Sequence, residues 1–97
     1  MAEVKANLVQ RFDDLKNAGD FLYTLNKEFK IGGLISVCPC GCGSIGGIQF
    51  DTGDPSQKGP KWQWDGNESE PTTTPSILRK SGCGWHGYLT KGVFISC

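Results

Sequence analysis

The sequence carries six side chains of the types that bind transition metals, in two clusters and one isolated position. The first cluster reads Cys-Pro-Cys-Gly-Cys-Gly, the second reads Cys-Gly-Trp-His, and the sixth side chain is the final residue. In chain order they are Cys38, Cys40, Cys42, Cys83, His86 and Cys97. Thiolate and imidazole together favour four-coordinate zinc. We therefore predict one structural Zn²⁺ ion, bound by ligands drawn from this set.

The spacing around the single histidine supports this prediction. Two residues separate Cys83 from His86, and at this spacing a tight turn can direct both side chains at one point. A hairpin with residues 90–92 as a three-residue loop would place His86 opposite Ser96 and beside Cys97. One cysteine of the first cluster would then complete the tetrahedron. Which four of the six candidates bind remains open at this point.

Disulfide bonds are the alternative use for these cysteines. The chain has five, an odd number, so at least one would be left over. Residues 1–10 contain no continuous apolar run of the kind found in secretory signals, and disulfides are rare in reducing compartments. We therefore favour zinc over disulfides and over redox-active thiols. Within the first cluster, Cys38 and Cys42 converge more easily than an extended Cys-x-Cys pair, which makes Cys40 the expected spare.

The elements that must position these ligands follow from composition. Residues 1–30 hold half of the charged side chains and only one glycine, whereas residues 31–97 hold 13 Gly and all of the Pro, Trp, Cys and His. We predict one small β-rich domain, α+β at most and zinc-ribbon-like. Residues 1–30 would form an N-terminal element packed on a zinc-binding β module of residues 31–97.

The spacing of apolar residues predicts the elements in more detail. Val4, Leu8, Phe12 and Leu15 recur at helical spacing and predict a short N-terminal helix that ends at Gly19. Alternation and turn residues predict strands at residues 21–25, 34–37, 45–50, 61–65, 76–79, 86–89 and 93–96.

Three tryptophans and a hydroxyl-rich run invite functional interpretations. Trp62, Trp64 and Trp85 could stack on a ligand, but a domain of this size needs large aromatic side chains in its core, and we favour that use. Together with Asp65 they are the candidate partner surface. Residues 72–76 are rich in hydroxyls and are expected to form an extended edge facing water. No GxSxG, HExxH or phosphate-binding loop is present, so we assign no catalytic residue and expect no enzyme.

The charge balance disfavours two classes of partner. Ten basic and ten acidic residues give a formal net charge of zero. A neutral chain lacks the long-range attraction to phosphate of nucleic-acid-binding proteins and to anionic membranes. No apolar run approaches the ~20 residues of a membrane span. We therefore expect neither a nucleic acid nor a membrane as partner.

The motifs, taken in order, resemble a small Cys-rich family met in phage and prophage genomes and, more divergently, in bacterial operons. The resemblance rests on CPCGCG at 38–43, WQWDGN at 62–67, PTTTPSI at 71–77 and CGWHGYLTKGVFISC at 83–97. It covers about 60 residues. It implies a phage accessory protein that acts in the host bacterial cytoplasm and binds a host protein, with inhibition of a host enzyme or defence complex as one form.

Two other functions stay open from the sequence alone. One is a single-stranded nucleic-acid-binding zinc-knuckle protein, which the zero net charge disfavours. The other is a small zinc-dependent enzyme, which would need an open metal position. The sequence does not indicate an oligomeric state.

Overall fold

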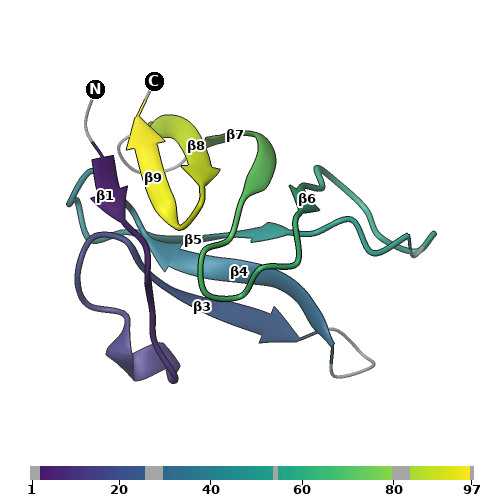
Figure 1. The fold of residues 1–97 in the computed structure, drawn as a ribbon, viewed down its shortest axis with the longest axis horizontal. Coiled ribbons are helices and arrows are strands. Elements are labelled where there is room, and N and C mark those ends of the chain that lie inside the picture. Colours follow the sequence, from purple (N-terminus) through teal and green to yellow (C-terminus); the bar gives the residue numbers. More distant parts are fainter. Residues whose placement is uncertain (1–2, 26–29, 54, 80–83, 97) are drawn as a thin grey trace.

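The fold is given by a computed structural model that describes residues 3–25, 30–53, 55–79 and 84–96. These residues form two sheets with almost no helix (Figure 1). The strands are β1 (Glu3–Lys5), β2 (Asn7–Leu8), β3 (Asp20–Leu25), β4 (Ile31–Val37), β5 (Ile45–Gln49), β6 (Gln63–Trp64), β7 (Thr73–Leu78), β8 (His86–Thr90) and β9 (Val93–Ser96). The prediction of a small β-rich single domain is confirmed, and each predicted strand overlaps an observed one.

The two sheets are joined at both of their ends. One has the order β1-β9-β8-β7-β6 and the other the order β2-β3-β4-β5. Strands β1 and β2 are consecutive, and the chain passes from one sheet to the other at the buried residue Ala6. At the opposite end, Phe50 forms an isolated bridge with Trp62, which joins the end of β5 to the start of β6. The arrangement is therefore barrel-like, with few long strand edges left unpaired.

The predicted N-terminal helix is wrong. The segment forms β1 and β2, and only Phe12–Asp14 are helical, as the 3₁₀ helix η1. Strand β1 pairs with β9 and β2 pairs with β3, so tertiary pairing overrides the local apolar spacing. Phe12 is 58% exposed, which shows that the apolar residues of this segment do not form one buried face.

The predicted hairpin is present, but its register is shifted by one residue. Thr90 pairs with Val93, so the loop consists of two residues and not three. Both loop residues, Lys91 and Gly92, have positive φ, as a two-residue hairpin turn of type I′ requires. Ser96 therefore pairs with Gly87 and not with His86.

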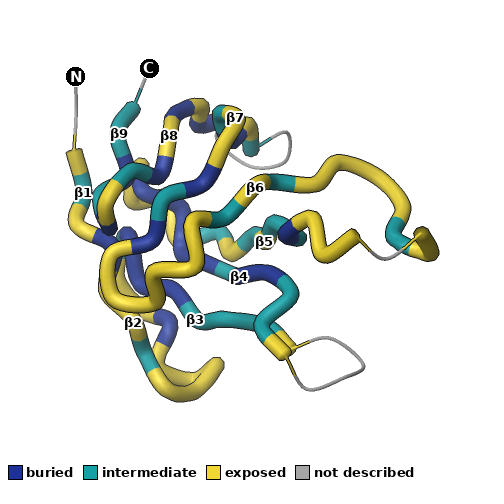
Figure 2. Tube along the Cα trace, turned by 45° about the vertical axis from the view of Figure 1, so that its right-hand side comes forward, coloured by how far each residue is buried: buried dark blue, intermediate teal, exposed yellow. Residues whose placement is uncertain are grey.

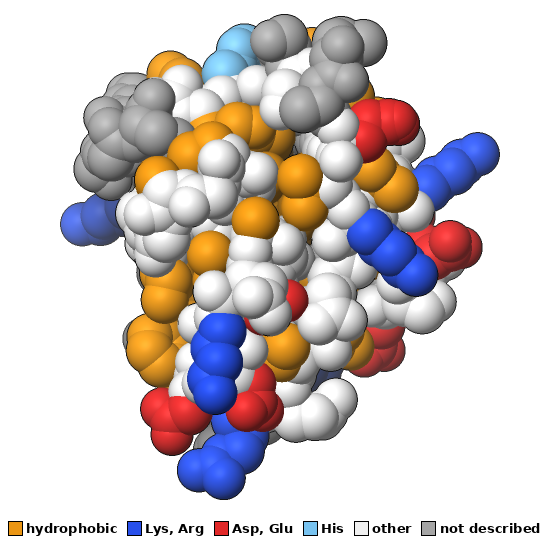
Figure 3. All heavy atoms as spheres, turned by 90° about the vertical axis from the view of Figure 1, so that its left-hand side faces the viewer, with side chains coloured by type: hydrophobic (Ala, Val, Ile, Leu, Met, Phe, Trp, Pro, Cys, Tyr) orange, Lys and Arg blue, Asp and Glu red, His pale blue; other side chains and the backbone are white. Residues whose placement is uncertain are grey.

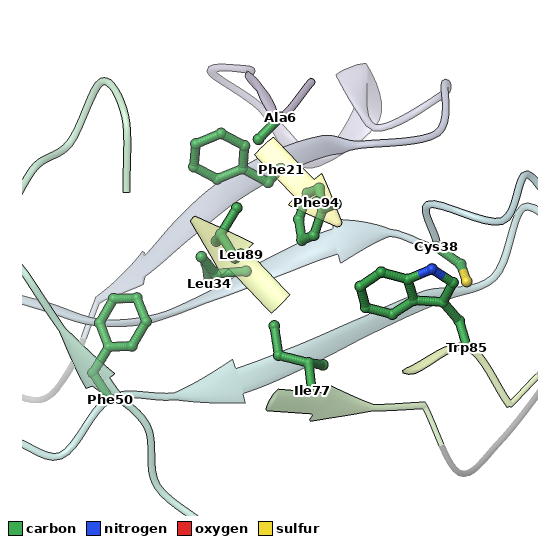
Figure 4. Close-up of a cluster of buried hydrophobic side chains, with 9 residues drawn as sticks. All are labelled: Ala6, Phe21, Leu34, Cys38, Phe50, Ile77, Trp85, Leu89 and Phe94. Atoms are coloured by element: carbon green, nitrogen blue, oxygen red, sulfur yellow. The ribbon is translucent and has the colours of Figure 1, made fainter. Parts of the chain in front are cut away.

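The core lies where the inner faces of the two sheets meet. Figure 4 shows its members, which come from both sheets and from the crossing at Ala6. Phe21, Leu34, Leu89 and Phe94 are almost completely buried. Figure 2 shows the same distribution along the chain, with buried residues on the facing strands and exposed residues concentrated in the loops.

A buried carboxylate fixes the start of β3. Asp20 accepts hydrogen bonds from the backbone N–H groups of Lys16 and Asn17 at 3.1 and 2.9 Å, and from the side chain of Asn7 at 3.1 Å. Burial acts to raise the pKa of Asp20, but these three donors outweigh it, so the pKa lies below its ordinary value of 3.8. The carboxylate thus ties the turn before β3 to β2.

No helix in the described part of the chain is long and apolar enough to cross a membrane.

Candidate active site and cysteine cluster

Strands β7 and β8 place a serine and a histidine on one outward face. Ile77 pairs with Gly87 and Leu78 pairs with His86, in antiparallel register. Ile77 and Gly87 are buried, whereas Leu78 and His86 are exposed. Because side chains alternate between the two faces of a strand, Ser76 shares the outward face with Leu78 and His86. Ser76 and His86 are then diagonal neighbours on adjacent strands, within reach of side chains that lean toward each other.

The two side chains are hydrogen-bonded. The distance from Ser76 Oγ to His86 Nε2 is 2.9 Å. Such a contact is the defining geometry of a serine nucleophile with its general base. When Nδ1 carries the ring proton, Nε2 is the acceptor and the hydroxyl donates to it. His86 can then accept the proton of the Ser76 hydroxyl, and neither side chain has to bind a metal ion for this.

A tryptophan holds the backbone of the serine. The indole Nε1 of Trp62 donates a hydrogen bond to the Ser76 carbonyl oxygen at 3.2 Å. The register of β7 against β8 shifts between Thr73 and Ile77. Ser76 therefore lies in an irregular stretch of β7, outside the regular pattern of hydrogen bonds between the two strands. The indole therefore replaces part of the support that a regular strand would give.

The described residues place no acidic partner on the histidine. Among the described residues, no aspartate or glutamate forms an ion pair or hydrogen bond with His86. An ion pair does form between Arg11 and Asp13, whose side chains are both largely exposed. Figure 3 shows the single histidine at one end of the molecule, next to hydrophobic side chains, with the charged side chains gathered elsewhere on that face. The described residues thus supply a serine–histidine dyad.

The first cysteine cluster also converges. The sulfur atoms of Cys38, Cys40 and Cys42 all lie within 4.8 Å of one another, and the Cys38 and Cys40 sulfurs are 3.3 Å apart. Zinc–sulfur bonds of about 2.3 Å in tetrahedral geometry separate sulfurs by about 3.8 Å, so the three could hold one metal ion. Cys40 is a member of this group.

Local backbone geometry explains the convergence. The cluster connects β4 to β5, and the N–H of Gly41 donates to the carbonyl of Cys38 at 3.1 Å, which closes a tight turn. Gly41 and Gly43 have φ of +90° and +84°, values that glycine adopts without strain. The N–H of Cys42 points at the Cys40 sulfur, at 3.4 Å. An N–H donor of this kind stabilises a thiolate.

The structure separates the predicted ligands into three sets. The three cysteines of the first cluster are together, His86 contacts Ser76, and Cys83 and Cys97 lie outside the described residues. The four-ligand set that includes Cys83, His86 and Cys97 therefore stays a prediction.

Cys38 and Trp85 relate the cysteine cluster to the start of β8. Cys38 is fully buried in the core cluster that also contains Trp85, and Figure 4 shows both at the same end of that core. Trp85 immediately precedes His86, and its indole donates to Ser96 Oγ at 2.9 Å. The β4–β5 connection and the start of β8 thus belong to one packed unit.

The predicted partner surface is mostly packed inward. Trp85 is buried, whereas Trp62 and Trp64 are partly buried and pack against the core. Trp64 stacks on Phe50 with ring centroids 5.0 Å apart. Asp65 is exposed, and its carboxylate accepts from the N–H of Asn67 at 3.0 Å.

The loop after Trp64 carries negative charge against a tyrosine of the other sheet. The Tyr23 hydroxyl donates to the Glu68 carbonyl at 2.9 Å. Burial, followed by the negative charges of Glu68 and Asp65, raises the pKa of Tyr23 to about 12. Tyr23 thus links the second sheet to this loop as a neutral donor.

Ser76 is a candidate functional residue that the sequence analysis did not single out. The run 72–76 was expected to face water, and Ser76 does lie on the outward face, but its partner comes from the next strand. The available signal was the single histidine, five residues before a hairpin turn, with a serine at a strand position nearby. From the sequence, His86 was considered only as a metal ligand beside cysteines, and so Ser76 was not considered as its partner.

Comparison with known proteins identifies the family. The family model described as bacterial ubiquitination-like system serine protease (BubE) matches residues 8–97, so the chain belongs to this family. No curated protein and no solved structure matches it. The prediction of a phage accessory protein that binds a host protein is therefore wrong, because the family model describes a protease of a bacterial system. The finer resemblance to a phage Cys-rich family is likewise not supported.

Proposed function

We propose that this BubE-family chain is a serine peptidase with Ser76 as the nucleophile and His86 as the general base. The observation that carries the proposal is the 2.9 Å contact between Ser76 Oγ and His86 Nε2. The description of the family as a serine protease of a ubiquitination-like system supports it independently. The substrate class is then a peptide or isopeptide bond of a protein in such a system.

The chemistry follows from the geometry. His86 Nε2 takes the proton of the Ser76 hydroxyl as Oγ forms a bond to the substrate carbonyl carbon. The C–N bond then breaks, and His86 gives its proton to the leaving amine. Water, activated by the same imidazole, cleaves the acyl ester and regenerates Ser76. Trp62 positions the Ser76 backbone during these steps through its bond to the carbonyl oxygen.

Covalent labelling tests the dyad without knowledge of the substrate. A fluorophosphonate should modify Ser76, as read by mass spectrometry of the digested protein. Ser76→Ala should abolish the label, and His86→Ala should slow it by roughly 100-fold or more, because general-base assistance contributes on the order of 10²–10⁴. Ser69→Ala removes an exposed serine of the 65–70 loop and serves as the matched control. Labelling of a folded Ser76→Ala variant at the wild-type rate would refute the assignment.

We further propose that the cysteine cluster holds a structural zinc ion. Cys38, Cys40 and Cys42 would supply three thiolates, and Cys83 and Cys97 are the candidates for the fourth position. The donor set suits zinc, because three convergent sulfurs with N–H support are typical of closed structural sites. In this proposal His86 serves Ser76 and the ion fixes the β4–β5 connection beneath the active-site strands.

Metal analysis tests the zinc proposal. Elemental mass spectrometry of the protein purified under reducing conditions should find one zinc per chain. Cys40→Ser and Cys42→Ser change exposed positions and should each lower the zinc content after dialysis. Ser44→Ala, which removes the hydroxyl 3.1 Å from the Cys42 sulfur, is the control that keeps all thiols. Full zinc retention in both cysteine variants would exclude this ligand set.

A further inference from the structure

One strand edge next to the nucleophile is left unpaired by the fold. Strand β6 pairs with β7 only through Gln63 with Thr74 and Trp64 with Thr73. Before Gln63 the chain turns away, because the main chain of Trp62 bonds to Gln49 and Asp51 and not to β7. Within the described residues, no strand lies beside β7 from Ser76 to Leu78 on that side.

The direction of the main-chain groups along this edge follows from the register. The N–H of Arg79 donates to the Trp85 carbonyl at 2.8 Å, so Arg79 faces β8. On the other side, the Thr72 carbonyl accepts from Asp65 at 3.1 Å, so even-numbered residues of this segment face the β6 side. Because successive residues of a strand alternate, the N–H and C=O of Leu78 both point to the open edge.

The hydrogen bonds that an added strand could form along this edge are limited on one side by Trp62. The Ser76 carbonyl, which points to the same side, is already taken by the Trp62 indole. An added strand could therefore pair with Leu78 and would have to stop at the indole. The stopping point is therefore at Ser76, the residue whose hydroxyl a substrate carbonyl must reach.

The side chains of the same region are apolar and exposed. Leu78 is 51% exposed and Tyr88 is 46% exposed, on the outward face that carries Ser76 and His86. Large apolar side chains at a catalytic face gain buried area only when something covers them. An extended peptide offers both the main-chain partners for the edge and side chains for this face.

We propose that the substrate enters as an extended polypeptide segment that adds a short strand to β7 at Leu78, with an apolar side chain against Leu78 and Tyr88. This inference rests on the proposed peptidase function. Main-chain pairing would supply affinity without sequence preference, and the apolar contact would supply selectivity. The segment must have unpaired main-chain groups in the free substrate, as an unstructured segment has.

A matched pair of variants separates the main-chain contact from the side-chain contact. Leu78→Ala trims the side chain and keeps the N–H, whereas Leu78→Pro also removes the N–H that faces the edge, where proline is tolerated. The substrate is an internally quenched decapeptide, chosen by screening a positional library with the wild-type protein. On this peptide, the kcat/KM of Leu78→Pro should be roughly tenfold below that of Leu78→Ala. The loss of one hydrogen bond is enough to account for a roughly tenfold decrease in kcat/KM. Leu25→Ala, at an exposed position on the other sheet, is the control for apolar trimming.

Backbone N-methylation of the same decapeptide tests the proposal with the wild-type protein, so the result does not depend on how the proline variant folds. Methylation of the one substrate residue that pairs with Leu78 should lower kcat/KM, whereas methylation of its two neighbours should not, because adjacent residues of a strand face opposite sides. Equal kcat/KM for the two Leu78 variants together with a flat methylation scan would overturn the proposal. So would failure to cleave any unstructured peptide while the fluorophosphonate still labels Ser76. Loss of that label would instead count against the dyad itself.

Discussion

Replacing Trp62 with phenylalanine should slow acylation of Ser76 more than it harms the fold. Phenylalanine keeps an aromatic ring against the core but removes the Nε1 donor that lies 3.2 Å from the Ser76 carbonyl. That donor is the support that holds the serine backbone within the irregular part of β7. Without it, Ser76 can shift relative to His86.

The magnitude follows from the contacts. Loss of one hydrogen bond costs about 1 kcal/mol, and the smaller ring costs a similar amount of packing. For a domain of this size, about 2 kcal/mol lowers the melting temperature by roughly 10 °C. A displacement of 1 Å at a reacting centre can cost about 100-fold in rate. Because the 2.9 Å bond to His86 still restrains the hydroxyl, we expect about a tenfold loss.

Trp64→Phe is the matched control. Its indole also donates to a carbonyl, that of Asn67, at 3.3 Å, and its ring is also partly buried. Both variants should therefore lose similar stability in thermal melts. Only Trp62→Phe should slow fluorophosphonate labelling of Ser76. Equal labelling rates for the two variants, at temperatures where both are folded, would refute the positioning role of Trp62.

Three further predictions concern the surrounding fold. Because the pKa of Asp20 is lowered in the folded state, its carboxylate stabilises the fold above its ordinary value of 3.8, and this contribution is lost as pH falls through the native pKa. Asp20→Asn should lower the melting temperature by about 5 °C at neutral pH, as for ~1 kcal/mol, and an equal deficit in acid would contradict this. Alkaline absorbance titration should show one tyrosine that ionises near 12, and Tyr23→Phe should remove that step; a single step near the ordinary value for both tyrosines would argue against it. Gly87→Ala would place a Cβ 2.6 Å from the Trp85 ring and into the Ile95 carbonyl, so urea unfolding should show a loss of about 3 kcal/mol, and wild-type stability would exclude the clash.

The strands were predictable because their signals are local. Alternation along residues 86–89 and 93–96, with Lys91-Gly92 between them, is enough to place a hairpin. Its register was missed because the turn uses a positive φ at Lys91, a conformation that is uncommon at a non-glycine residue. A shift of one residue changes which side chains face each other, so the predicted partners of His86 changed with it.

The N-terminal segment and the dyad could not be read locally. Val4 and Leu8 are spaced as in a helix, yet the partners that make this segment extended, β9 and β3, lie far along the chain or across a turn. The contact between Ser76 and His86 likewise depends on the pairing of β7 with β8. The cysteine cluster was easier, because Gly41 and Gly43 place three nearby sulfurs together within one connection.

The position of β9 has a consequence for how the molecule is made. Among the described strands, β9 leaves the ribosome last, yet it lies between β1 and β8 in its sheet. Strand β1, the first of the described strands to be synthesised, has no partner until β9 has emerged, and closing so long a loop is slow. The sheet that carries Ser76 and His86 cannot be completed on a partial chain. A chain that stops before β9 is therefore expected to lack a stable form of this sheet.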